Sequence, residues 1–359
     1  MALASAATPA SPVLHPASRS VGWLRSPGFD LLLVGGTAGL GIAAGLAVFV
    51  DAALFAPILL ADLWLLGYHH VISTFTRTAF DSESFQRYRH LLIWLPFFVI
   101  GAVVAVGTGI GLWMIPTVYL YWQWWHYTRQ SYGVAQLYRR KAGGAADGSW
   151  GLKSVIYGLP LVGILYRSEQ ASETFLGLSV RWIPMHPAVV IAVAVVVGAA
   201  LLWWSTRQWM AWRGGQRIGM YQWYLLSHLV IFALGYLVLR NINHGWLVIN
   251  VWHNAQYVMI VWLYNNNRFK SGVDPAHRFL STLSQGRNVI PYLVVCLAIS
   301  TVAYLSIGEI LGTMSFAALP LALIAFQTVN FHHYIVDGII WKVRRPAIRA
   351  NLVAKSKAA

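Results

Sequence analysis

Residues 91–128 read LLIWLPFFVIGAVVAVGTGIGLWMIPTVYLYWQWWHYT, an apolar run without a Lys, Arg, Asp or Glu. A helix that crosses the hydrocarbon core of a bilayer needs about 20 apolar residues, so this run is long enough for two membrane-spanning helices. Gly107, Gly109, Gly111 and Pro116 predict a tight connection between them. Backbone groups in lipid must be hydrogen-bonded within their own segment, and this requirement favours helices.

The rest of the chain has a similar composition. It is 58% hydrophobic and 10% charged, with a mean hydropathy of +0.58, whereas about a quarter of the residues in a soluble domain are charged. We predict an all-α, polytopic integral membrane bundle of about ten transmembrane helices. The expected spans lie near residues 29–50, 52–76, 91–110, 113–137, 152–167, 187–206, 219–239, 246–266, 289–310 and 315–341.

The net charge of +15 comes from 26 Lys and Arg against 11 Asp and Glu. If the N-terminus of a ten-span bundle is cytoplasmic, all of these basic residues except Arg167, Arg181 and Arg240 fall in cytoplasmic segments. This asymmetry is the positive-inside rule, and it predicts that both termini are cytoplasmic. The basic excess therefore indicates contact with anionic membrane lipids and no nucleic-acid partner. We expect a multi-pass protein of a bacterial inner membrane.

The chain is predicted to form one membrane domain with two tails. Residues 1–24 are rich in Ala, Ser and Pro and lack an apolar core, so we expect a disordered N-terminal tail, with a transit peptide as the alternative. Residues 25–345 form the single transmembrane domain, and residues 346–359 form a basic cytoplasmic tail. Cys296 is the only cysteine, which excludes an intrachain disulfide and a thiolate metal cluster. The longest loops are expected at Arg77–His90, Arg139–Lys153, Arg167–Pro187 and Arg268–Arg287.

Several of the twelve histidines lie inside predicted spans, where a polar side chain needs a reason. Intramembrane ionisable residues usually face a bundle interior and mark function. Four spans that run in the same direction carry histidines at similar depth, so their imidazoles could meet at one centre. The predicted metal ligands are His69, His70, His126, His253, His332 and His333. The alternative for each single histidine is an interhelical hydrogen bond.

Each of these helices carries further polar residues at helical spacing from a histidine. The four stripes are Asp62, His69, Ser73 and Thr76; Tyr119, Gln123, His126 and Gln130; Asn250, His253, Asn254 and Tyr257; and Gln327, Asn330, His333 and Asp337. His332 lies on another face of its helix. A ligating histidine usually passes its second N–H to a carboxylate or amide, so the stripes resemble a metal site with its supporting residues.

We expect Asp337 and Asp62 to orient ligands, and Tyr257 or Gln130 to position oxygen or substrate. Asp62 could instead pair with Arg129, and Asp337 with Lys342. His228 lies on a span of the opposite direction and is expected to act only in support of the site.

Imidazole ligands suit iron, copper and zinc, and carboxylate support favours non-haem iron. We therefore predict a metal-dependent oxygenase with a hydrophobic isoprenoid, carotenoid or lipid substrate. Any electrons that it needs would come from a separate electron donor. The alternatives are a transporter or proton-conducting protein that uses the same buried groups, and an electron carrier in which pairs of histidines bind haem.

Four segments carry a resemblance to a known family. They are Gly67-Tyr68-His69-His70, Trp125-His126-Tyr127, Trp252-His253-Asn254-Ala255-Gln256-Tyr257 and Phe331-His332-His333-Tyr334-Ile335-Val336-Asp337. In their order they resemble the bacterial Brp/Blh-type β-carotene-cleaving dioxygenases, which are membrane-embedded non-haem iron enzymes. The resemblance implies iron ligated by histidines from several spans, and it aligns His332 with a family ligand. Tyr257 stands where the family has the second histidine of a pair, and the family's aspartate after the first histidine is absent.

Overall fold

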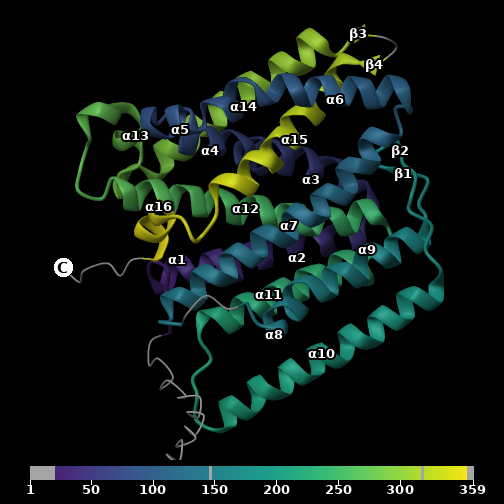
Figure 1. Ribbon diagram of the computed structural model, residues 1–359, viewed down its shortest axis with the longest axis vertical. Coiled ribbons are helices and arrows are strands. Elements are labelled where there is room, and N and C mark those ends of the chain that lie inside the picture. The colour runs from purple at the N-terminus through teal and green to yellow at the C-terminus, as the bar shows by residue number, and fades with distance from the viewer. Residues whose placement is uncertain (1–20, 145–147, 317–318, 354–359) are drawn as a thin grey trace, which may run out of the picture.

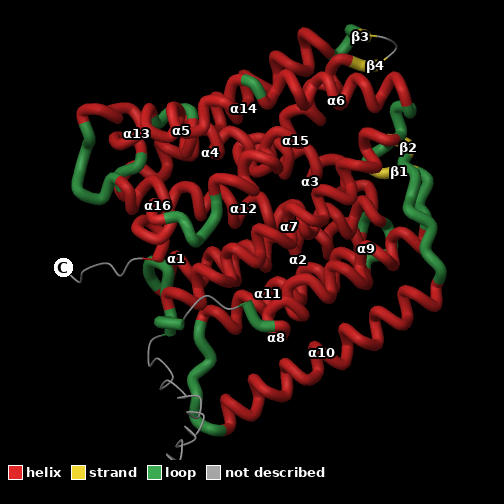
Figure 2. Tube along the Cα trace, in the orientation of Figure 1, coloured by secondary structure: helices red, strands yellow, loops and turns green. Residues whose placement is uncertain are grey.

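The computed structural model describes residues 21–144, 148–316 and 319–353, and almost all of its regular structure is helical (Figures 1 and 2). This confirms the all-α class. The helices are α1 (Pro27–Leu31), α2 (Thr37–Val50), α3 (Phe55–Asp62), α4 (Tyr68–Thr78), α5 (Ser82–Ile93), α6 (Leu95–Gly109), α7 (Met114–Lys141), α8 (Trp150–Lys153), α9 (Leu159–Gln170), α10 (Pro187–Arg213), α11 (Met220–Ala233), α12 (Ile242–Arg268), α13 (Arg278–Leu283), α14 (Val289–Leu311), α15 (Leu321–Ile340) and α16 (Pro346–Ile348).

The described residues also include short 3-10 helices at Ala52–Leu54, Pro275–His277 and Gly286–Asn288, and two small antiparallel hairpins. Strand β1 (Thr174–Phe175) pairs with β2 (Leu178–Ser179), and β3 (Ser315–Phe316) pairs with β4 (Leu319–Pro320). Both hairpins lie at the end of the bundle opposite α13 and α16 (Figure 1).

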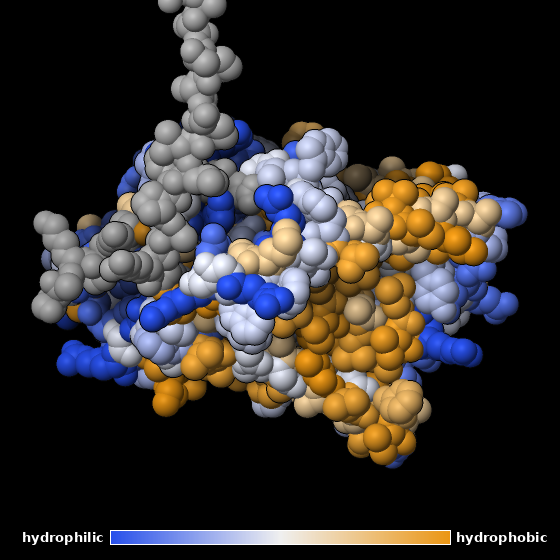
Figure 3. Space-filling model, turned by 90° about the horizontal axis from the view of Figure 1, so that it is seen from below, coloured by the Kyte–Doolittle hydropathy of each residue, from blue (hydrophilic) through white to orange (hydrophobic). Residues whose placement is uncertain are grey.

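Six helical segments of the described chain are long and apolar enough to cross a bilayer. They are Pro27–Val50, Ala52–Thr78, Ser82–Gly109, Pro187–Arg213, Met220–Val238 and Gly286–Leu311. The surface seen from below the view of Figure 1 carries a broad apolar area, with hydrophilic residues gathered toward its ends (Figure 3). A bilayer would cover such a surface, so these segments indicate an integral membrane protein.

The other four predicted spans are also helical, but they are not among these six segments. They correspond to α7, the segment from α8 to α9, α12 and α15. Helices α7, α12 and α15 contain the histidine-bearing polar stripes, and these side chains lower the mean hydropathy of the helices. The composition that weakens them as membrane spans is therefore the composition that carries the candidate site.

Helix α12 forms the centre of the bundle and α10 its outer edge (Figure 1). Most residues of α12 are buried, and the helix packs against α2, α4 and α11. One contact is especially close, because a Cβ added to Gly245 would lie 1.9 Å from the carbonyl oxygen of Gly235. Only glycine fits there. Helix α10 has the same length of 27 residues but buries a single one, Val190.

Within the described residues, π turns lie at Leu32–Gly36, Leu63–Gly67, Ser154–Gly158, Leu234–Val238 and Arg349–Val353, and the first three interrupt continuous helices. A π turn bonds residue i to i+5 and so accommodates one extra residue. All side chains that follow are rotated by about 100° relative to an uninterrupted α-helix. The turn at Leu63–Gly67 separates Asp62 from the histidines of α4, and it decides which of them enters the centre.

Three boundaries differ from the sequence predictions. The predicted loop Arg77–His90 is mostly helical, because Asp81 caps α5 by accepting the backbone N–H of Ser84 (3.1 Å). The last predicted span, near 315–341, begins with a hairpin, and its helix starts only after Pro320. Residues 346–353, which were predicted to belong to the cytoplasmic tail, form α16 and a π turn. Their side chains Ile348 and Leu352 are buried.

Residues 1–20 of the predicted N-terminal tail, 1–24, lie outside the described residues. The described part packs on the bundle. Leu24 is buried, and the backbone N–H groups of Leu24, Arg25 and Ser26 donate to the carboxylate of Asp30.

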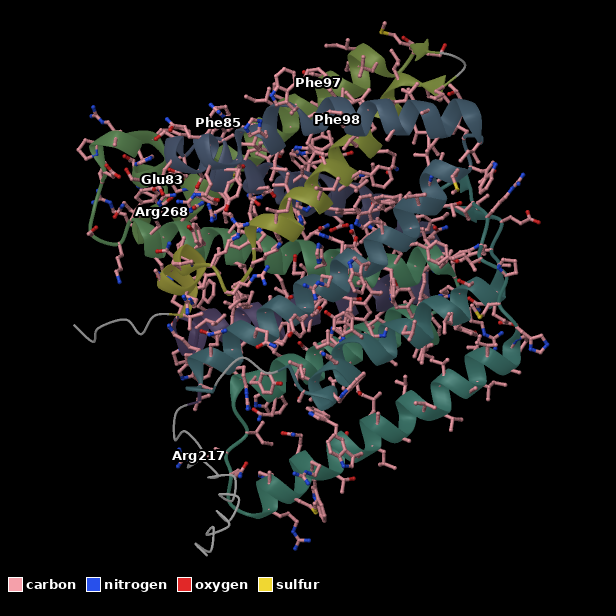
Figure 4. The ribbon with its side chains drawn as sticks, in the orientation of Figure 1. Glu83, Phe85, Phe97, Phe98, Arg217 and Arg268 are labelled. Atoms are coloured by element: carbon pink, nitrogen blue, oxygen red, sulfur yellow. The ribbon has the colours of Figure 1, made fainter. Side chains whose placement is uncertain are left out.

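A buried ion pair at the α13 end should make the fold sensitive to acid. Arg268 donates to both oxygens of Asp81 (2.5 and 2.8 Å), His277 contacts the same carboxylate, and Glu83 lies beside Arg268 (Figure 4). Burial alone raises the pKa of Asp81, but the hydrogen bonds from Arg268 and Ser84 outweigh it and hold this pKa below its usual value. A carboxyl with a depressed folded-state pKa contributes stability above its unfolded-state pKa of about 4, and this stability is lost as the pH falls through the folded-state pKa.

We therefore expect the melting temperature of the detergent-solubilised protein to fall steeply below about pH 4. The Asp81→Asn variant should melt lower at neutral pH, by the equivalent of about 1–3 kcal/mol, and should show a flatter acid limb. Thermal unfolding followed by circular dichroism at several pH values measures both. Parallel acid limbs for the two proteins would contradict the assignment.

Candidate metal centre

Four side chains with metal-ligating atoms meet inside the bundle. His70 comes from α4, His126 from α7, and His333 and Asp337 from α15. One ligand atom from each of the four lies within 4.8 Å of the others, and all four side chains are buried. His333 and Asp337 are one helical turn apart and share a face of α15. Three imidazoles and one carboxylate, free of any thiolate, form a buried group within metal-binding distance.

His70 and His333 are close to the spacing of two ligands of one ion. Their Nε2 atoms lie 2.7 Å apart, at hydrogen-bond distance, and their rings are inclined at 75°. Two nitrogens that each lie about 2.1 Å from one ion, at about 90° to each other, are about 3.0 Å apart. Asp337 Oδ2, in the same cluster of side chains, lies 3.5 Å from His333 Nε2. A shift that moves the two nitrogens about 0.3 Å apart would accommodate an ion.

A hydrogen-bonded chain fixes which nitrogen of His333 carries the proton. Tyr257 of α12 donates to Asp337 Oδ1 (2.7 Å), so the Thr74 hydroxyl, 2.7 Å from the Tyr257 oxygen, donates to that oxygen. Thr74 can then accept from His333 Nδ1 at 3.1 Å. This assignment leaves the lone pair of His333 on Nε2, the nitrogen that faces His70. A metal ligand needs that tautomer.

Neighbouring side chains also orient the carboxylate of Asp337. Trp341 Nε1 donates to the Tyr257 oxygen (2.9 Å), so that the hydroxyl proton points at Asp337. Tyr257, which the sequence suggested as a group that handles oxygen or substrate, is therefore placed to position Asp337. Thr74 lies one turn after His70 and Trp341 one turn after Asp337. The same helical spacing that identified the histidines could have identified both.

His253 of α12 lies against the four-residue group but is not part of it. Its ring centroid is 4.9 Å from that of His70 and 5.0 Å from that of His126. Within the described residues, neither of its ring nitrogens has a hydrogen-bond partner, and the same holds for Nε2 of His126. Buried polar groups are nearly always paired. Unpartnered nitrogens on two adjacent imidazoles therefore indicate an ion or water at this place.

Three other histidines proposed from the sequence lie outside the four-residue group. His69 is buried but is not part of it. His332 contacts the carbonyl oxygen of Leu91 at 2.7 Å, and His228 contacts that of Ile156 at 3.1 Å. Both carbonyl contacts are interhelical hydrogen bonds, which was the alternative for a single intramembrane histidine. His228 therefore has a structural role, and its expected role in support of the site is not seen.

The surroundings of Asp62 can also be described. Asp62 accepts from Asn250 Nδ2 (2.5 Å), and Asn250 accepts from the hydroxyl of Tyr127, whose ring lies 4.1 Å from that of His253. Asp62 thus supports the site through two intermediates. The alternative partner, Arg129, instead donates to Tyr157 (2.7 Å).

Two cavities reach the centre. The larger has a volume of about 610 Å³ and is lined by His126, Gln130, Tyr257 and Asp337 at the centre, within the range of about 300–1,000 Å³ common for ligand pockets. Gln130 also donates to the backbone carbonyl of His253 (3.1 Å). The smaller cavity, about 130 Å³, is almost entirely apolar and touches His332 and His333. The aromatic run Tyr121–Trp125 is not among the residues that line either one.

Comparisons of the chain with protein-family models, with curated proteins and with solved structures each found no match.

Proposed function

We propose that this protein is a membrane-embedded oxygenase whose centre holds a non-haem iron. The proposal is carried by one observation, the convergence of three imidazoles and one carboxylate within 4.8 Å in a buried site. His70, His126, His333 and Asp337 would hold the ion, and His253 is close enough to join them. A set of histidine and carboxylate ligands without a thiolate favours iron over a structural zinc. Copper or zinc would be the alternative metals.

Four protein ligands leave room in the coordination shell of an iron ion, and iron with open positions supplies the activation of dioxygen. The chain contributes the rest. Tyr257 and Trp341 hold the carboxylate of Asp337 in place, Thr74 fixes the tautomer of His333, and the surrounding helices exclude bulk water. The large cavity beside His126 and Asp337 offers the position for a substrate, and its apolar walls suit an isoprenoid, carotenoid or other lipid.

The electron balance separates two reaction types. A dioxygenase places both oxygen atoms in the substrate and needs no other reductant. A monooxygenase places one atom in the substrate and reduces the other to water, and for this it needs two electrons and two protons from a separate electron donor. The resemblance to Brp/Blh-type enzymes, which rests on four short segments, agrees with the first type.

The same proposal includes the membrane topology. The six apolar segments, together with the helices from α8 to α9 and α7, α12 and α15, would make ten spans with both termini in the cytoplasm. Arg217 and Arg268 lie at the α13 end of the bundle (Figure 4), which would then be cytoplasmic, in agreement with the positive-inside rule. A bacterial inner membrane would accommodate this arrangement.

Metal analysis combined with oxygen uptake tests the function. We expect the purified protein to contain close to one iron per chain and to consume oxygen when a suitable hydrophobic substrate is present. His126→Ala should lose both properties, whereas His90→Ala, an exposed histidine of α5, should keep both. Absence of stoichiometric iron, copper or zinc would refute the metal centre. Flux across proteoliposomes that requires His126 but consumes no oxygen would favour the transporter.

A further inference from the structure

The large cavity has two chemically different ends. One end touches the metal centre at His126 and Asp337. The other is lined by the basic side chains of Arg140, near the end of α7, and of Lys342 and Arg344, which follow α15. Arg140 follows His126 by fourteen residues, about 20 Å along α7, whereas Lys342 follows Asp337 by five residues, about 8 Å, so the basic groups extend from near the centre to the far end of the cavity. The wall between them is mainly apolar and includes Leu137 and Ile260.

The cations at the far end have no anionic partner in the described part of the chain. Arg140, Lys342 and Arg344 form no salt bridge there, and Asp337, at the opposite end, is the only carboxylate among the described lining residues. Arg140 is half-buried, and its Nε is a buried donor without a partner. A fourth lining cation, Arg129, is already bonded to Tyr157. A buried guanidinium donor without an acceptor is costly, and an oxyanion is its natural partner.

We propose that this cavity binds an amphiphile with an oxyanion headgroup, a phosphate or a carboxylate, held by Arg140 and Lys342. The hydrocarbon chain of the amphiphile would extend along Leu137 and Ile260 toward His126 and Asp337. The inference rests on the proposed function for the chemistry that follows, but binding itself does not. It narrows the substrate from any hydrophobic molecule to one with a charged head. A fixed headgroup would also determine which carbon of the chain reaches the centre.

Three probes with the same chain separate the possible headgroups: hexadecyl phosphate, hexadecanoate and hexadecanol. Each is titrated into the full-length protein as purified, in nanodiscs of zwitterionic lipid, and saturable binding is measured. We expect at least one of the two anions to bind about 10- to 100-fold more tightly than the alcohol, the effect of one or two charge-assisted hydrogen bonds. Preference for the phosphate or for the carboxylate identifies the head. Equal affinities for all three probes, or no saturable binding, would overturn the proposal.

Two pairs of variants locate the binding site. Arg140→Gln with Lys342→Gln should reduce anion affinity to that of the alcohol, whereas Arg213→Gln, an exposed cation at the end of α10, should leave it unchanged. A Cβ added to Gly133 in the cavity wall, or to Gly198 of α10, meets no heavy atom within 4 Å, so both positions accept a larger side chain. Gly133→Leu should block binding of the anions and Gly198→Leu should not. Unchanged binding in Gly133→Leu would mean that the anions occupy a structural lipid site elsewhere, and would also overturn the proposal.

These outcomes are independent of those for the metal. Headgroup-selective binding by a protein without stoichiometric metal would refute the oxygenase and keep the binding site. Stoichiometric iron and oxygen uptake without headgroup selectivity would support the oxygenase and refute the proposed binding site.

Discussion

Replacing His333 by alanine should empty the metal centre, whereas the same replacement at the adjacent His332 should leave the metal in place. His333 is one of the four residues in the buried group, and its Nδ1 lies 3.1 Å from the Thr74 hydroxyl. Loss of a residue that merely supports a ligand costs about 10- to 100-fold in metal affinity. Loss of the ligand itself should cost more than about 100-fold, which would reduce the purified protein to a metal content near zero.

His332 is a matched control for His333. Both are histidines at nearly the same depth in the bundle, but their side chains point in different directions from α15. Its ring contacts the carbonyl oxygen of Leu91 on α5, so His332→Ala should cost about 1 kcal/mol of stability and leave the centre intact. Inductively coupled plasma mass spectrometry on both variants measures the metal. Loss of metal from His332→Ala with retention in His333→Ala would favour the ligand that the family resemblance implies, and would contradict the structure.

The second large effect concerns the adjacent histidines of α4. His70→Ala should remove the metal as completely as His333→Ala, and His69→Ala should leave close to one metal per chain. The reason is geometric: Nε2 of His70 lies 2.7 Å from Nε2 of His333, and His69 is not part of the group. Metal content and melting temperature are measured for both variants. The melting temperature matters here because both histidines are buried, and a variant that has lost its fold is identified by its lack of a cooperative transition.

The opposite result at α4 would also be informative. Retention of metal in His70→Ala and its loss in His69→Ala would mean that the helix is regular between Asp62 and the histidines. The π turn at Leu63–Gly67 would then be absent from the protein in its membrane.

This π turn shows where prediction from the sequence fails. In an uninterrupted helix, Asp62 and His69 are seven residues apart and share a face, so the polar stripe included His69. The extra residue in the turn restores this relation one position later, for Asp62 and His70. Leu63–Gly67 reads LWLLG, an ordinary apolar stretch with no residue that signals a π turn. Helix α15 contains no such turn before its histidines, and there the stripe includes His333, the histidine that lies in the four-residue group.

Other features were predictable for clear physical reasons. Long apolar runs identified the six segments that can cross a bilayer, since length and hydropathy are properties of the local sequence. The meeting of histidines from α4, α7 and α15 followed from their similar depth in the bundle, although neither the choice of His70 over His69 nor the place of Asp337 within the group did. The hydrogen-bonded chain from His333 through Thr74 to Tyr257 was not predicted, because it depends on how α4, α12 and α15 are rotated about their own axes.

Helices α10 and α12 have equal lengths and opposite surroundings. Almost every side chain of α12 is enclosed by protein, so a change of shape at most positions must disturb a neighbour. In helix α10 only Val190 is fully buried, although Leu201 and Trp204 also pack against the core, and on the outward face of the helix one aliphatic side chain is as good as another in lipid. Random mutagenesis should therefore leave α10 free to drift among apolar sequences, while α12 tolerates little change along its whole length.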